Sequence, residues 1–280
     1  MNDLYEWRWL VTIRKILVQV DDAQACGARL TAAFELAAKF PAAVTGVYVP
    51  REVGAFVFAE GGMSASLYDE EVAMITADCA EAKSRFADVG AASGLKHAWC
   101  EVQGMDVDVL ADTARFHDLL VLAQGDPSDP KCRNVGLPGA VVLAAGTPVL
   151  VIPPSGAASG LGQRVLIASN GSREGARAIR DSLPMLHLAR EIHLLCVDGQ
   201  PGNLAPLKDY LYAHGLVTIS HELTPETGEI GETLLSQANA VRADLIVLGA
   251  YGHSRVREFV LGGATRSVLQ GSTIPAFMTH

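Results

Sequence analysis

The sequence predicts an α/β protein made of two tandem, doubly wound domains, each with a five-stranded parallel sheet. Three observations lead to this prediction. Short apolar runs alternate with helical segments, the order of these segments occurs twice, and spaced glycines follow one apolar run of the second copy. Alternating strands and helices are typical of parallel sheets with right-handed crossovers and helices on both faces.

The first copy predicts five strands and four helices. Its first helix is rich in alanine and ends at Pro41, which cannot continue a helix. Its second helix is long and amphipathic, with Val72, Ile75, Cys79 and Phe86 on one face. The expected strands are Ile16–Val20, Val44–Val49, His97–Val102, Leu119–Leu122 and Val149–Ile152, and the expected helices are Ala25–Phe40, one within Leu67–Ala92, Val107–Phe116 and Pro138–Ala145.

The second copy predicts the same order of elements. Its apolar runs are short enough for buried strands and are separated by segments with helical periodicity. The expected strands are Val165–Ser169, Ile192–Val197, Leu216–Glu222, Leu245–Leu248 and Ala276–Thr279, and the expected helices are Arg173–His187, Leu204–His214, Gly231–Val241 and Ala264–Gln270. We expect Ser172 to cap the first of these helices rather than to act as a nucleophile.

The repeat is visible in three matched segments that occur in the same order in both halves. They are Arg14–Asp21 with Gln163–Asn170, His117–Leu122 with Ala243–Leu248, and Thr147–Ile152 with Ile274–Thr279. The Pro-, Ser- and Gly-rich segment that starts at Pro153 has the composition of a linker. We therefore expect a leader at 1–11, a first domain at 12–154, a linker at 155–162 and a second domain at 163–280.

Composition narrows the class of protein. The chain has 280 residues, 49% of them hydrophobic and 19% charged, with a formal net charge of −9. This charge argues against nucleic acid as a partner, because no basic excess is present to neutralise phosphates. The five cysteines lack C-x-x-C spacing and the histidines lack metal-ligand spacing, so neither a disulfide framework nor a metal site is indicated. Scattered thiols favour a reducing, cytoplasmic location.

Neither the N-terminal residues nor the most apolar run of the chain indicates a membrane segment. Residues 1–10 mix charged and apolar side chains, which does not fit a secretory signal. The most apolar run, Ala140–Ile152, is interrupted by Gly146, Thr147 and Pro148 and is too short to span a bilayer. We expect no membrane partner.

The glycines after Leu245–Leu248 are the main candidate for a binding site. Gly249 and Gly252 follow this strand, and Gly262 precedes the last predicted helix. Glycines let the backbone approach a ligand, and a helix N-terminus presents N–H groups and a partial positive charge to a phosphate. Neither the Walker A loop nor the G-x-G-x-x-G fingerprint is present. The alternative is that these glycines serve tight turns alone.

The order of the elements and the pattern G-x2-G-x9-G after the fourth strand of the second copy resemble the universal stress protein family. The resemblance covers nearly the whole chain as two tandem copies and is strongest over Ala243–Leu269. It implies adenine-nucleotide α-hydrolase-like domains, some of which bind ATP. In that pattern, adenine and ribose lie at the end of the first strand, and the triphosphate lies on the glycine loop and the following helix.

The resemblance implies a nucleotide site in the second copy, for ATP with or without Mg²⁺. Asn170 stands where the family usually has Asp, and the hydroxyl of Thr265 lies two positions later than usual. The residues implied for this site are Ala168, Ser169, Asn170, Val197, Leu248, Gly249, Tyr251, Gly252, Arg255, Gly262, Gly263, Ala264 and Thr265.

The first copy departs from the same pattern. Asp21 ends its first strand, but Ala123 and Asp126 replace the two motif glycines, and only Gly136 corresponds to the later one. A carboxylate repels phosphate at close range, and Pro127 and Pro130 remove N–H donors. We expect this copy to be retained for structure and unable to bind ATP. A small apolar ligand near Phe56, Phe58 and Met63 is an alternative to simple packing of these side chains.

The sequence thus predicts a regulatory stress-response protein rather than an efficient enzyme. His253, Arg255 and Arg257 are candidates for a γ-phosphate clamp or for slow hydrolysis, and the alternative is a solvated loop. A scaffold without nucleotide is the other alternative. The last strand is an expected edge, and the resemblance implies that it pairs with Val149–Ile152 in a pseudo-dimer within the chain, with a homodimer left open. The protein partner is not specified by the sequence.

Overall fold

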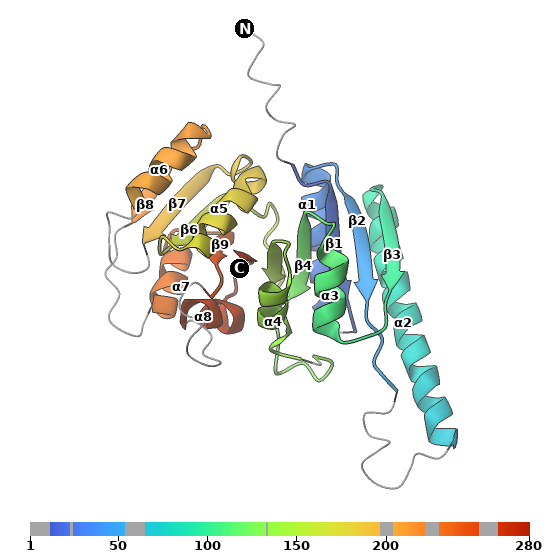
Figure 1. The fold of residues 1–280 in the computed structure, drawn as a ribbon. Coiled ribbons are helices and arrows are strands. Elements are labelled where there is room, and N and C mark those ends of the chain that lie inside the picture. The colour runs from blue at the N-terminus through green and yellow to red at the C-terminus, as the bar shows by residue number, and fades with distance from the viewer. Residues whose placement is uncertain are drawn as a thin grey trace.

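The computed structural model describes residues 12–22, 25–53, 65–132, 134–196, 204–221, 230–251 and 263–280. These residues form a ten-stranded sheet with helices on both faces (Figure 1). The elements of the first half are β1 (Lys15–Val20), α1 (Cys26–Lys39), β2 (Ala43–Tyr48), α2 (Ala65–Ser93), β3 (His97–Glu101), α3 (Asp106–Ala114), β4 (Leu119–Ala123), α4 (Leu137–Ala144) and β5 (Val149–Ile152).

The second half repeats this order, apart from the length of its second helix. Its elements are β6 (Arg164–Ser169), α5 (Arg173–Leu186), β7 (Glu191–Cys196), α6 (Leu204–Ala213), β8 (Ile219–His221), α7 (Ile230–Ala240), β9 (Leu245–Gly249), α8 (Gly263–Gly271) and β10 (Ala276–Thr279). The predicted α/β class with parallel strands is confirmed, and the predicted element types agree with the observed ones.

The two halves join through their last strands. The strand order is β3-β2-β1-β4-β5-β10-β9-β6-β7-β8, so each half has the same internal order and the two meet at β5 and β10. These two strands pair antiparallel, with Phe277 opposite Leu150, whereas the strands within each half pair parallel. The predicted pairing of the last strand with Val149–Ile152 is therefore confirmed, and both strands lie inside the sheet rather than at an edge.

Apolar side chains fill a layer on each face of the sheet. On one face, α1, α2, α5 and α6 pack through residues such as Phe34, Phe86 and Leu183. On the other face, α3, α4, α7 and α8 pack through residues such as Leu110 and Leu234. Central strands covered on both faces require continuous apolar runs. This requirement explains why the runs at Leu119–Leu122 and Leu245–Leu248 are uninterrupted.

Two aspartates hold the starts of the first strands in matched ways. Asp118 precedes β4 and accepts hydrogen bonds from the backbone N–H groups of Arg14 and Lys15 at 2.7 and 2.9 Å. Asp244 precedes β9 and accepts from the N–H groups of Gly162, Gln163 and Arg164 at 2.8, 3.0 and 3.0 Å. The repeat is thus preserved in its polar contacts as well as in its core.

One predicted strand is wrong in length. The sequence predicts Leu216–Glu222, but β8 contains only Ile219–His221. The N–H group of Leu216 donates to the carbonyl of Leu211 at 2.9 Å, so Leu216 is part of the turn that closes the C-terminus of α6 and not of a strand. Val217 is 80% exposed. At this edge of the sheet, the alternation of apolar residues in the sequence does not match the burial of their side chains.

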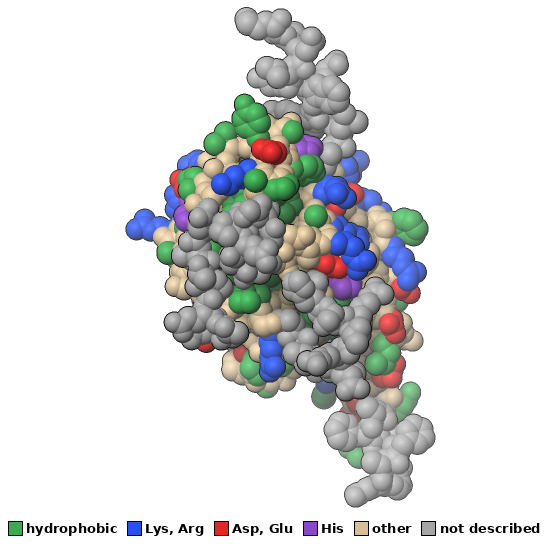
Figure 2. Space-filling model, turned by 60° about the vertical axis from the view of Figure 1, so that its left-hand side comes forward, with side chains coloured by type: hydrophobic (Ala, Val, Ile, Leu, Met, Phe, Trp, Pro, Cys, Tyr) green, Lys and Arg blue, Asp and Glu red, His purple; other side chains and the backbone are tan. Residues whose placement is uncertain are grey.

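The edge at β8 carries apolar side chains on the surface. Tyr212, Val217 and Ile219 are exposed there, and Figure 2, which turns this half forward, shows hydrophobic side chains at its upper end. Among the described residues, no helix is both long and apolar enough to cross a membrane.

Candidate functional site

The candidate site lies at the carboxyl ends of β6 and β9. These neighbouring parallel strands pair Ala168 with Leu248, so Ser169 ends one strand where Gly249 ends the other, and Asn170 follows Ser169. Open parallel sheets bind ligands at this edge, where the crossovers diverge to opposite sides. The structure thus brings together predicted site residues from segments far apart in the sequence.

The turn after β6 is held by its own short polar side chains. Ser169 Oγ accepts from the N–H of Gly171 at 3.3 Å, and Asn170 Oδ1 accepts from the N–H of Ser172 at 3.1 Å. Ser172 Oγ in turn accepts from the N–H of Gly175 at 3.1 Å and caps α5. The predicted cap is confirmed. The Asn170 side chain uses its oxygen to fix the turn, and amides are well suited to this local role.

Gly249 is explained by packing. A Cβ atom built on Gly249 would lie 2.2 Å from the backbone nitrogen of Gly175 and 2.5 Å from the carbonyl carbon of Glu174. These are backbone atoms of the first turn of α5, which cannot move aside as a flexible side chain can. The end of β9 therefore needs glycine for contact with α5, whether or not a ligand binds.

Tyr251 and Thr265 connect the end of β9 to the start of α8. The N–H of Tyr251 donates to Thr265 Oγ1 at 3.5 Å, and Thr265 is buried. Tyr251 has a φ of 61°, a left-handed conformation that costs free energy for a residue with a side chain. Burial raises the pKa of the Tyr251 hydroxyl to about 12, and this hydroxyl has no hydrogen-bond partner among the described residues.

Among the residues that the structure describes, none covers the start of α8. Gly263 is exposed, and a Cβ atom built there would meet no described heavy atom within 4 Å. The first N–H groups of an α-helix have no acceptor within the helix. In α8, which has nine residues, Ala264 and Thr265 lie in the first turn, where these N–H groups are found. Close contact between Gly231 of α7 and Ser267 of α8 fixes the position of the helix beside the sheet.

Several predicted residues lie outside the described residues. Val197, Gly252, Arg255 and Gly262 of the candidate nucleotide site are among them, as are His253 and Arg257 of the proposed clamp. The predicted apolar residues Phe56, Phe58 and Met63 also fall outside. The placement of these residues stays a prediction.

The corresponding acid of the first half is engaged in an ion pair. Asp21 Oδ1 lies 2.7 Å from Arg29 Nη2, and Arg29 Nε donates to the carbonyl of Gln19 at 2.7 Å. The Arg29 side chain is 1% exposed. Burial acts to lower the pKa of Arg29, but the nearby Asp21 and Cys26 outweigh this effect, so the pKa of Arg29 is raised. Asp21 therefore balances a buried charge inside the protein.

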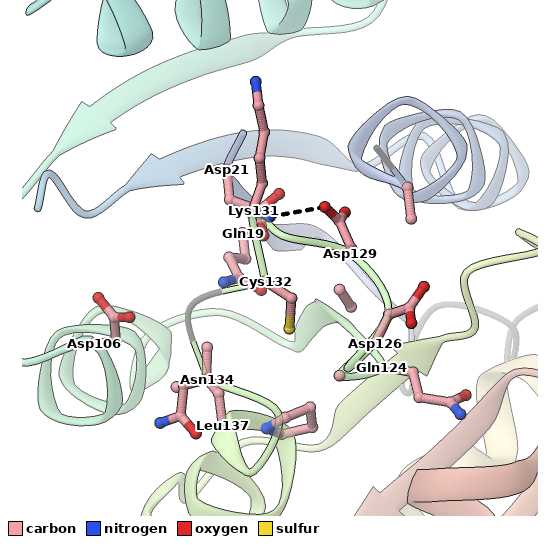
Figure 3. A pocket seen from close by; sticks show the side chains of 14 residues that line it. Gln19, Asp21, Asp106, Gln124, Asp126, Asp129, Lys131, Cys132, Asn134 and Leu137 are labelled. Carbon is pink, nitrogen blue, oxygen red and sulfur yellow. Dashed lines mark hydrogen bonds between the residues drawn. The ribbon is translucent and has the colours of Figure 1, made fainter. Parts of the chain in front are cut away.

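A loop of the first half fills the crevice between β1 and β4. Figure 3 shows Asp129, Lys131 and Cys132 of this loop beside Gln19 and Asp21 at the end of β1. A Cβ atom on Gly125 would lie 2.3 Å from the carbonyl oxygen of Val135, so the two ends of the loop touch. The remaining cavity of about 40 Å³ has room for a few water molecules, whereas small-molecule sites have roughly 300 Å³ or more.

The crevice of the first half is also acidic. Its lining includes Asp21, Asp106, Asp126 and Asp129. Hydrogen bonds from the hydroxyl and N–H of Ser128 lower the pKa of Asp126, which keeps this carboxyl negatively charged. A charged carboxylate repels phosphate at close range, and the expectation that the first half does not bind ATP stays a prediction.

Sequence spacing missed a pair of histidines. His193 Nδ1 lies 2.9 Å from His221 Nε2, and His193 Nε2 lies 3.4 Å from Glu191, which pairs with Arg164. The two histidines lie on adjacent strands, and the register that pairs Leu195 with His221 was not readable from spacing within one segment. Among the described residues, no group of three or more His, Cys, Asp or Glu side chains is placed to hold a metal ion.

Comparisons with known proteins agree with this architecture. The model of the universal stress protein family matches residues 202–280. A universal stress protein from Archaeoglobus fulgidus DSM 4304 is similar in fold, with a TM-score of 0.73, 18% identity, and coverage of 95% of this chain and 97% of that chain. A functionally unknown protein from Pseudomonas aeruginosa PAO1 has a TM-score of 0.62, 14% identity, and coverage of 95% and 92%. No curated protein matches the sequence.

Proposed function

We propose that the second half of the chain, whose residues 202–280 match the model of the universal stress protein family, binds an adenine nucleotide, with ATP as the first candidate. The nucleoside lies against the end of β6, and the phosphates lie against the loop after β9 and the start of α8. The first half supports the fold without binding ATP.

The observation that carries this proposal is the difference between the residues of the two halves at the carboxyl ends of their strands. In the first half, the acid at the end of β1 is paired with buried Arg29, and the cavity keeps Asp126 and Asp129 beside the start of α4. In the second half, Asn170 and Ala178 stand at the positions of Asp21 and Arg29. The described residues at the start of α8 are Gly263, Ala264 and Thr265, which carry no charge that would oppose a phosphate.

The start of α8 fits the chemistry of an anion. Its N–H groups and the helix dipole favour negative charge. The open space at Gly263 permits close approach to the backbone, because no side chain stands there. Mg²⁺ would arrive with the triphosphate, since the described residues form no metal site of their own.

The role that follows is regulatory. A nucleotide bound beside Tyr251 and the start of α8 would change how a partner protein is recognised there. Binding can therefore report nucleotide level to a partner protein. Slow hydrolysis is the alternative, and loss of turnover in Arg255→Ala or His253→Ala would favour it.

Calorimetric titration of ATP against the full chain tests the proposal. We expect one site per chain and at least tenfold weaker binding in Gly263→Asp, because the added carboxylate lies at the helix start where phosphate would bind. The matched control is Gly136→Asp at the start of α4, which should bind ATP as the natural protein does. Absence of both binding heat and thermal stabilisation by ATP would contradict the proposal and favour a scaffold.

A further inference from the structure

Arg177 of α5 joins three parts of the chain. Its Nη2 donates to the carbonyl of Gly146, which lies in the turn between α4 and β5 of the first half. Its Nη1 donates to the carbonyl of His280 at 3.0 Å, and its Nε lies 3.5 Å from Asp181. One guanidinium thus connects the first half to the residue that follows β10.

His280 continues this connection to the end of β9. Its Nδ1 donates to the carbonyl of Ala250 at 3.0 Å. Its ring also meets the ring of Tyr251 edge-on, with the centroids 6.3 Å apart. The N–H of Ala250 donates to the carbonyl of Thr279 at 2.8 Å. Ala250 and Tyr251, which follow β9, are therefore held by the His280 ring and by β10, and Arg177 holds the backbone oxygen of His280.

The first half provides an internal control, because it lacks these side chains. Pairing of Ala123 with Ile152 and of Gly249 with Thr279 aligns Pro153 with His280 and Gly125 with Tyr251. The alignment of Asp21 with Asn170 places Ala28 at the position of Arg177. A Cβ atom on Gly156, just after β5, would lie 3.1 Å from the Ala28 side chain, so Ala28 faces the corresponding place. The backbone bond from Ala250 to Thr279 has a counterpart between Gln124 and Ile152, so within the described part of the chain only the side-chain connection is specific to the half with the candidate site.

We propose that Arg177 and His280 are positioning residues that couple Ala250 and Tyr251, which follow β9, to the joint between the two halves. This inference rests on the proposed function. A nucleotide that rearranges Ala250 and Tyr251 shifts the His280 ring, and Arg177 transmits this change to the turn at Gly146. Because coupling between two sites is reciprocal, the position of the first half also changes the affinity of the loop for nucleotide.

Amide hydrogen exchange of the full chain tests the coupling without relying on activity. In Arg177→Ala and in His280→Ala, without nucleotide, we expect exchange of the Ala250 and Tyr251 amides to be about five- to tenfold faster. Arg180→Ala on the same helix is the matched control, because Arg180 is exposed, and should exchange as the natural protein does. Arg177→Lys keeps the charge but cannot serve both carbonyls at once, so its effect should be smaller than that of alanine.

The double variant Arg177→Ala/His280→Ala separates coupling from general destabilisation. Residues that act through one another give a double effect close to the larger single effect, whereas independent residues give additive effects. With ATP present, slower exchange at Gly146 and Thr147 in the natural protein, lost in Arg177→Ala, supports the inference. Normal exchange at Ala250 and Tyr251 in both single variants overturns it.

The same experiment distinguishes this inference from the proposed function. If ATP does not bind the natural protein, the proposed function fails, and the coupling is judged from exchange in the unliganded variants. If ATP binds the natural protein and all variants equally, and unliganded exchange is unchanged, the coupling fails and nucleotide binding stands. Thermal melting by circular dichroism checks that each variant is folded before exchange is measured.

Discussion

Gly249 and Gly175 meet backbone to backbone, and a Cβ atom on Gly249 would lie 2.2 Å from the nitrogen of Gly175. This contact fixes the end of β9 against the first turn of α5, where Ser172 caps the helix. Gly249 is thus required by the fold, whether or not a ligand binds. The presence of Gly249 therefore does not by itself indicate a ligand at the end of β9.

Gly249→Ala is expected to destabilise the protein by about 1–3 kcal/mol, the usual range for forcing an extra methyl group into a packed site. Urea denaturation measures the loss. Gly263→Ala is the control, because its added methyl meets no neighbour and alanine favours helices, so the free energy of unfolding should stay equal or rise slightly. Equal stability of both variants would show that α5 moves away from β9 easily.

The ion pair of the first half gives a second expectation. Asp21→Asn leaves the guanidinium of Arg29 buried without its counter-charge, and such changes typically cost about 3–5 kcal/mol. Urea denaturation of Asp21→Asn and of the double variant Asp21→Asn/Arg29→Ala measures this cost. The double variant should recover part of it, because it removes the buried charge as Ala178 does in the second half. No recovery would mean that Arg29 acts mainly through its packing.

The histidine pair predicts a dependence of stability on pH. Burial, and then the neighbouring His193, lower the pKa of His221. A base with a lowered folded pKa contributes stability above its unfolded pKa of about 6.5, and this contribution is lost as pH falls through the folded pKa. Melting temperature should therefore fall between pH 7.5 and 5.5.

His221→Gln isolates this contribution. Burial also lowers the pKa values of His117 and His187, so the natural protein and the variant share part of the pH dependence. The melting temperature of the variant should depend less on pH than that of the natural protein, because glutamine can hydrogen-bond to His193 and does not titrate. Identical slopes for the two proteins would exclude His221 as a source of the dependence.

The fold could be predicted from the sequence because its determinants are local and occur twice. Runs such as Leu119–Leu122 and Leu245–Leu248 are buried on both faces, so their apolar character identified them as central strands. The pairing of β5 with β10 followed from the repeat and the resemblance together. Sheet edges were less predictable, since β8 has only one neighbouring strand and its pattern is not set by burial.

The contacts around the candidate site were harder to predict, because they join distant segments. Arg177 and His280 lie 103 positions apart, and neither has a motif around it. Asp21 matched the family pattern, yet the ion pair with Arg29 depends on the geometry of α1 above β1. The glycine signal was ambiguous at Gly249, since close packing and ligand approach select the same residue.

Tyr251→Phe separates the structural role of Tyr251 from a role in binding. The hydroxyl is buried without a partner among the described residues, and burial raises its pKa to about 12. Removing an unpaired buried hydroxyl should leave the free energy of unfolding unchanged or raise it by about 1 kcal/mol, as measured by urea denaturation. Tyr251→Ala should lower it, because the ring contact with His280 is lost. If Tyr251→Phe is instead destabilised by more than about 1 kcal/mol, the hydroxyl has a hydrogen-bond partner within the ligand-free protein. If Tyr251→Phe keeps its stability but binds ATP more weakly, the hydroxyl contributes to nucleotide binding.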